Sequence, residues 1–204
     1  MKIAPWVLKT AAELEPFVAK TFPHLSNGIP GLSSAMLKDH LKLYEGYVKN
    51  TNSTLESFLK VIQPSFSPAE HELRRRLGWE FAGMRLHEYY FENLSAKETT
   101  PGKEFVTAVT DLRAWEEDFR RMTETRGIGW VALVYDKSSK MLLNIWINEH
   151  NEGHIPGAEY LLVIDLFEHA YTKDYGINRE EYKDAFMKAI DWDVVEERFK
   201  RCRG

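Results

Sequence analysis

Residues 161–171 constrain the fold more than any other part of this 204-residue chain. Residues 161–164 are apolar, a pattern typical of a short buried strand. The strand then ends in Asp165, and a carboxylate in that position is costly to bury unless it meets a cation. His169 follows four residues later, so the two side chains can converge on one metal ion. Alternatively, Asp165 caps a helix over residues 166–172.

The polar half of this stretch resembles the signature of a known family. Residues 165–171 read Asp-Leu-Phe-Glu-His-Ala-Tyr, which is similar to the Asp-x-Trp-Glu-His-Ala-Tyr motif of the iron/manganese superoxide dismutases. The resemblance implies an oxidoreductase that disproportionates superoxide to dioxygen and hydrogen peroxide. It implies one iron or manganese ion per chain, held by three histidines and one aspartate, with Asp165 and His169 among these ligands. Similar motifs extend over roughly residues 32–199.

A helix is expected to begin at Ser33 or Ser34, either of which can cap it, and to end near residue 52. His40, Tyr44 and Tyr47 are spaced at i, i+4 and i+7, so they share one face of this helix. An ordinary core stripe with one hydrogen-bonded histidine has the same spacing.

Tyr47 belongs to a Tyr-Val-x-Asn-x-Asn sequence that resembles the end of the family's first helix. In the family a ligand histidine lies eight residues before this tyrosine. Here that position is Asp39, and His40 follows it. The resemblance therefore implies His40 as the ligand if the helix has lost one residue, or Asp39 if the aspartate has replaced the histidine. We favour His40, because a second carboxylate would depress the reduction potential and because His40 shares a face with Tyr47.

The remaining ligand is expected on a second helix, over residues 67–93. This segment begins with Ser-Pro-Ala-Glu, a capping box with proline in the first turn. His87 lies in a Leu-His-Glu-Tyr-Tyr-Phe sequence similar to the family's Asn-His-x-Phe-Tyr-Trp, whose histidine is a ligand. Gly83 stands where many iron enzymes have an active-site glutamine, so a hydrogen bond to metal-bound solvent must come from elsewhere.

His150 is the residue implied for that hydrogen bond. Manganese enzymes have a glutamine near this position, and some archaeal members have a histidine in a similar Asn-His-x-x-x-His context. His154 is the alternative. By the same resemblance Tyr47 gates the substrate funnel and relays protons. Other residues implied to surround the site or line its funnel are Tyr44, Trp130, Phe167, Glu168, Tyr171 and Arg179.

Some of these residues have implied roles of their own. Trp130 and Phe167 would form an apolar wall that admits only small anions, and Arg179 would draw an anion toward the funnel. Glu168 would reach across a two-fold interface to His169 of the partner subunit, since a carboxylate commonly orients a metal-bound histidine. The expected assembly is a homodimer, with pairing of dimers into a tetramer left open.

The expected fold is α+β: an N-terminal helical hairpin, then a C-terminal domain with a three-stranded antiparallel sheet backed by helices. Helices are expected within residues 104–125, and strands at residues 127–134, 141–148 and 160–165. The domain boundary is expected within residues 95–103, which include Pro101 and Gly102, and the predicted domains are residues 1–98 and 99–204. Residues 53–66 are expected to be a connection.

The composition argues against several other classes of protein. A net charge of −4 offers no case for binding nucleic acid or an acidic membrane. No apolar run approaches the ~18 residues of a membrane span. The first residues lack the apolar core of a signal peptide, and Cys202 is the single cysteine, which excludes an internal disulfide. We therefore expect a cytoplasmic protein.

Three alternatives compete with a dismutase. One is a non-catalytic dimeric protein of the same fold. The second is a different mononuclear metalloenzyme that uses two histidines and a carboxylate, with His40 off the metal. The third is a helical domain whose histidines belong to the core.

Overall fold

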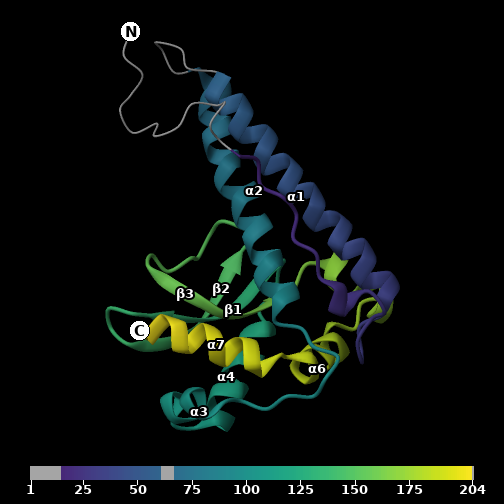
Figure 1. Ribbon diagram of the computed structural model, residues 1–204, viewed down its shortest axis with the longest axis vertical. Coiled ribbons are helices and arrows are strands. Elements are labelled where there is room, and N and C mark those ends of the chain that lie inside the picture. Colours follow the sequence, from purple (N-terminus) through teal and green to yellow (C-terminus); the bar gives the residue numbers. More distant parts are fainter. Residues whose placement is uncertain (1–14, 61–66, 204) are drawn as a thin grey trace.

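The computed structural model describes residues 15–60 and 67–203. Two long helices, α1 (Ser34–Lys60) and α2 (Pro68–Glu92), form a hairpin that stands on a compact body of sheet and shorter helices (Figure 1). The α+β class expected from the sequence is confirmed, whereas the domain boundary near residue 98 stays a prediction. The other elements are η1 (Pro23–Leu25), α3 (Lys103–Val109), α4 (Leu112–Thr123), β1 (Gly129–Asp136), β2 (Met141–Asn148), β3 (Ala158–Asp165), η2 (Glu168–Ala170), α5 (Thr172–Tyr175), α6 (Arg179–Ala189) and α7 (Trp192–Arg203).

The start of α2 agrees with its capping signals. The Ser67 side chain accepts a hydrogen bond from the backbone N–H of Glu70 at 3.2 Å, and Pro68 occupies the first turn. The expected end of α1 near residue 52 is wrong, because the helix continues to Lys60. Residues 53–60 contain neither proline nor glycine, so nothing in the local sequence interrupts the helix while α1 packs along α2.

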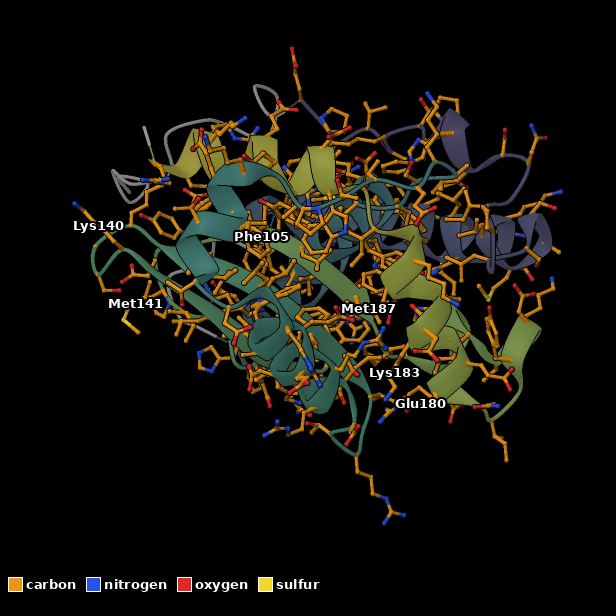
Figure 2. The ribbon with its side chains drawn as sticks, turned by 90° about the horizontal axis from the view of Figure 1, so that it is seen from below. Phe105, Lys140, Met141, Glu180, Lys183 and Met187 are labelled. Atoms are coloured by element: carbon orange, nitrogen blue, oxygen red, sulfur yellow. The ribbon has the colours of Figure 1, made fainter. Side chains whose placement is uncertain are left out.

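The sheet has the strand order β2-β1-β3, and both pairs are antiparallel. Helix α4 packs against β1 and β2, while α2 and α7 pack against β3. The turn between β1 and β2, with Lys140 and Met141, lies at the edge of the molecule, whereas Phe105 of α3 is completely buried (Figure 2). The central strand β1 is buried for almost its whole length, as its apolar sequence requires.

Strand β3 carries an irregularity that α7 stabilises. The pairing of β1 with β3 shifts register between Leu133 and Val134. The carbonyl of Leu161 at this point accepts a hydrogen bond of 2.9 Å from the guanidinium of Arg198. Farther along the strand, Asn93 at the end of α2 accepts the N–H of Val163 at 2.8 Å. These bonds fix β3, and therefore Asp165 at its end, relative to α2.

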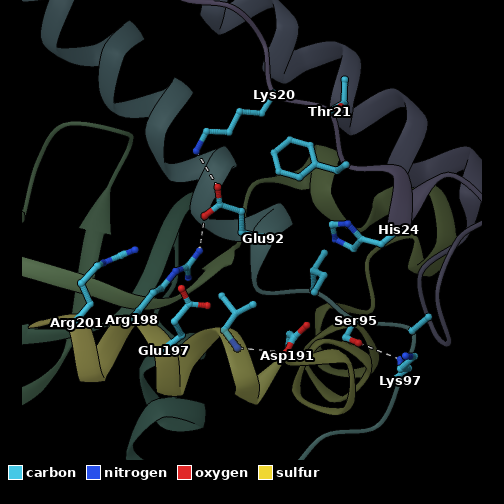
Figure 3. Close-up of a pocket in the computed structure, with 14 residues that line it drawn as sticks. Lys20, Thr21, His24, Glu92, Ser95, Lys97, Asp191, Glu197, Arg198 and Arg201 are labelled. Carbon is cyan, nitrogen blue, oxygen red and sulfur yellow. Dashed lines mark hydrogen bonds and ion pairs between the residues drawn. The ribbon is translucent and has the colours of Figure 1, made fainter.

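The chain segment before α1 is tied to the same region by ion pairs. Nζ of Lys20 lies 2.8 Å from Oε1 of Glu92, and Oε2 of Glu92 lies 2.8 Å from Arg198 (Figure 3). Because Arg198 is only 3% exposed, its charge needs these partners. Within the described residues, no helix has the length and apolar character needed to cross a membrane.

Candidate metal centre

Four side chains from separate parts of the chain meet where the hairpin joins the sheet. His40 comes from α1, His87 from α2, Asp165 from the last position of β3, and His169 from η2. One nitrogen or oxygen of each lies within 4.8 Å of the others. A spread of that size suits donor atoms that each lie ~2 Å from one shared cation.

The geometry is centred on one oxygen of Asp165. Its Oδ2 lies 3.0 Å from Nε2 of His40, 3.1 Å from Nε2 of His169 and 3.8 Å from Nε2 of His87. The other oxygen, Oδ1, accepts the backbone N–H of Phe167 at 2.8 Å. Asp165 therefore stabilises the turn after the strand, as a capping residue would, and also faces the three imidazoles.

The tautomer of His87 shows that the cluster suits a cation. Nδ1 of His87 is 2.6 Å from the carbonyl oxygen of Gly83, so it carries the hydrogen, and Nε2 keeps its lone pair. This Nε2 is buried and has no hydrogen-bond partner among the residues that the structure describes. A buried acceptor without a donor is costly, and a metal ion among these side chains would satisfy it. Imidazole nitrogens together with one carboxylate are suitable donors for iron or manganese.

For three of the four side chains, burial and neighbouring charge favour the protonation state that binds a metal. The exception is His169: burial would lower its pKa, but Asp165 outweighs this and raises it, so His169 must release a proton on coordination. Burial lowers the pKa of His40 and of His87, so both imidazoles remain neutral and keep a lone pair for coordination. Burial would raise the pKa of Asp165, but His169 and His40 outweigh it, and the pKa lies well below its usual range. The carboxylate is therefore ionised.

The structure distinguishes the two candidates on α1. His40 is fully buried and faces Asp165, whereas the side chain of Asp39 is 65% exposed. Asp39 makes an ion pair with Lys173 at 2.5 Å. The one-residue difference from the family's spacing thus turns the histidine inward and leaves the aspartate in solvent.

Beside the cluster, His150 connects two other expected residues. The indole N–H of Trp130 donates to Nδ1 of His150 at 3.1 Å, and Nε2 of His150 lies 2.7 Å from the hydroxyl of Tyr47. Because Nδ1 accepts from the indole, the neutral ring carries its hydrogen on Nε2 and donates it to Tyr47. Burial lowers the pKa of His150 to about 4, so the ring is neutral near pH 7.

Gly83 provides the space that this arrangement occupies. A Cβ on residue 83 would lie 2.7 Å from the ring of Tyr47 and 3.3 Å from Cδ2 of His150. His154, the alternative to His150, instead bonds to the carbonyl of His150 and to the hydroxyl of Tyr160.

The remaining expected residues differ in how close they lie to the cluster. Phe167 stacks on the rings of His150 and His169, with centroids 4.7 and 5.4 Å away, and it also contacts Trp130. Tyr44 is buried, but its hydroxyl bonds to Glu88 and to a backbone N–H rather than to the cluster.

Three further residues lie after the last ligand. Tyr171 is buried against Tyr182, whereas Glu168 is exposed. Arg179 donates to the carbonyls of Gly127 and Thr125, so it supports the turn before β1.

Sequence reasoning missed Trp79. The centroid of its ring lies 4.4 Å from that of His150 and 5.5 Å from that of Tyr47. The guanidinium carbon of Arg76 lies over the same ring, 4.0 Å from its centroid. Trp79 precedes His87 by eight residues, about two helical turns, so helical spacing alone would have placed it on the same face.

A helical hairpin on an antiparallel sheet, with three imidazoles and a carboxylate facing one another, defines a protein with a mononuclear metal site. Residues 100–198 match the family described as iron/manganese superoxide dismutases, C-terminal domain. An iron superoxide dismutase of Aquifex pyrophilus is 32% identical over 190 residues, covering 85% of this chain and 87% of the relative.

Two archaeal relatives extend the comparison. An iron superoxide dismutase of Pyrobaculum aerophilum is 28% identical, covering 88% of this chain and 90% of its own length. A manganese enzyme of Haloferax volcanii is 26% identical, covering 88% and 89%. The chain belongs to the iron/manganese superoxide dismutase family, as its sequence motifs predict.

Proposed function

We propose that this protein is a superoxide dismutase that converts superoxide to dioxygen and hydrogen peroxide at a mononuclear iron or manganese site. The observation that carries this proposal is the convergence of His40, His87, Asp165 and His169. Membership of the family supports the same activity.

In this proposal His40, His87, His169 and Asp165 hold the ion. When bound, the ion supplies one-electron chemistry by alternating between its trivalent and divalent states. The single carboxylate offsets part of the positive charge, while the imidazoles contribute neutral donors. His87 is oriented for this task, because the Gly83 carbonyl fixes its tautomer.

Tyr47 and His150 would handle one of the two protons that the reduction of superoxide to hydrogen peroxide requires. Because Nε2–H of His150 donates to the oxygen of Tyr47, the phenolic hydrogen is free to point toward an incoming anion. Burial raises the pKa of Tyr47, so the phenol remains protonated at neutral pH and is able to donate a hydrogen bond. Trp130 and Phe167 would exclude bulk water from this pair.

The assembly belongs to the proposal as well. The carboxylate of Glu168 is exposed next to the partly exposed His169, as a residue that reaches a partner subunit would be. Ile128 and Ile177 are exposed apolar side chains, at 41% and 100%. We expect a homodimer, with tetramer formation open, acting on superoxide in the cytoplasm.

The deciding experiment measures metal content and superoxide dismutation on the same purified preparation. We expect about one iron or manganese per chain and activity in proportion to the metal content. Bound metal without dismutation would favour a different mononuclear metalloenzyme. A folded dimer with neither metal nor activity would favour a non-catalytic protein of the same fold.

A further inference from the structure

The peptide that carries His150 lies in a short loop between β2 and β3. The backbone groups of Asn148 and Glu152 bond to each other across this loop, and residues 151–153 are exposed. His150 is nevertheless completely buried, with its ring between Trp130 and Tyr47. A further contact is needed to fix the position of its backbone, so that both ring nitrogens keep their hydrogen bonds.

His154 makes that contact. Its Nε2 lies 2.8 Å from the backbone carbonyl oxygen of His150, and a carbonyl only accepts, so Nε2 carries the hydrogen. In the neutral ring Nδ1 is then an acceptor, and the hydroxyl of Tyr160 donates to it at 2.5 Å. The tautomer of His154 is therefore determined from both sides.

Tyr160 connects this contact to the scaffold. It lies on β3, the strand that ends in Asp165, and its ring packs against Tyr89 of α2 at 5.3 Å. Burial raises the pKa of Tyr160 to about 12, so its hydroxyl remains a donor. The path from Tyr160 through His154 ties the loop to the two elements that carry His87 and Asp165.

We propose that His154, held in one tautomer by Tyr160, is a positioning residue that fixes the distance between the ring of His150 and the hydroxyl of Tyr47. It touches neither the metal cluster nor Tyr47 and acts through the backbone of His150. A shift of a few tenths of an ångström in that backbone would weaken the 2.7 Å bond between His150 and Tyr47. The catalytic part of this inference rests on the proposed function.

The test compares His154→Leu, His154→Gln and Tyr160→Phe with Asn151→Ala, an exposed position in the same loop. Leucine fills similar space but has no donor, whereas glutamine offers a donor and an acceptor. Two quantities are measured on the full-length chain: the dismutation rate per bound metal, and the Trp130 indole N–H signal in proton–nitrogen NMR spectra of the metal-free protein. The spectrum of Trp130→Phe lacks this signal and so identifies it.

We expect His154→Leu to lower the rate about tenfold, the effect of one lost hydrogen bond in a polar network, and to shift the indole signal. His154→Gln should recover most of both. Tyr160→Phe should have a smaller effect in the same direction, and Asn151→Ala should have none.

Several outcomes would overturn the inference. One is an unchanged rate and indole signal in His154→Leu. Another is a His154→Gln protein as impaired as His154→Leu, which would assign His154 to loop folding alone. If His154→Leu does not fold, an unchanged indole signal in Tyr160→Phe overturns it. A wild-type protein that binds metal without dismutation would refute the proposed function, while the indole signal would still test the positioning role.

Discussion

The ring of His150, from the β2–β3 loop, packs against Gly83 of α2, where a Cβ would lie only 3.3 Å from Cδ2 of His150. The same atom would lie 2.7 Å from the ring of Tyr47. Glycine at residue 83 therefore allows a side chain from the distant loop to approach Tyr47. A residue with a side chain at position 83 would compete for the same space.

Gly83→Ala should displace Tyr47 and His150 and reduce the dismutation rate, with a stability cost of about 1–3 kcal/mol from overpacking. Gly78→Ala on the same helix is the matched control, because no described atom beyond its chain neighbours and the adjacent helix backbone lies within 4 Å of its added Cβ. Alanine there should stabilise the helix by up to about 1 kcal/mol. Urea unfolding and activity of both variants check the prediction, and equal effects would contradict it.

His40→Ala should abolish stoichiometric metal binding, whereas Asp39→Ala should retain it. His40 is buried in the cluster, while Asp39 is exposed and pairs with Lys173. Elemental analysis of the two purified variants measures iron and manganese per chain. Loss of metal in Asp39→Ala alone would show that the aspartate is the ligand.

Tyr47→Phe should lower the dismutation rate about tenfold per bound metal, because the hydroxyl that bonds to His150 is lost. Metal content should stay near that of the wild type, since Tyr47 lies outside the four-residue cluster. Tyr135→Phe serves as a control, because this tyrosine packs against Phe199. A rate for Tyr47→Phe equal to that of Tyr135→Phe would argue against a role for the hydroxyl.

Acid should destabilise the metal-free protein partly through His150. Its folded-state pKa is about 4, below the ordinary value of 6.5. The unfolded chain therefore binds a proton first, and stability is lost as the pH falls from about 6.5 to 4. The loss is on the order of 3 kcal/mol at most. His150→Gln cannot titrate, so its unfolding free energy should vary less over this range, and parallel curves for the two proteins would contradict the assignment.

The sequence by itself predicted the fold class, the second helix and the strands, because capping signals and apolar periods are local. The extension of α1 to Lys60 was not foreseen, although residues 53–60 contain neither a proline nor a glycine that would end the helix. Trp79 was missed because no motif includes it, although it contacts His150.

Within the metal centre, the motifs indicated which residues to consider, and the tertiary structure shows where each of the alternatives lies. The sequence left His40 and Asp39 open, as it did His150 and His154. Only the packed structure shows that His40 turns inward while Asp39 meets Lys173 in solvent. Residue order specifies which side chains are available, but their tautomers and distances depend on partners contributed by remote segments. That is why His154, which resembles a site residue in sequence, instead bonds to the backbone of His150.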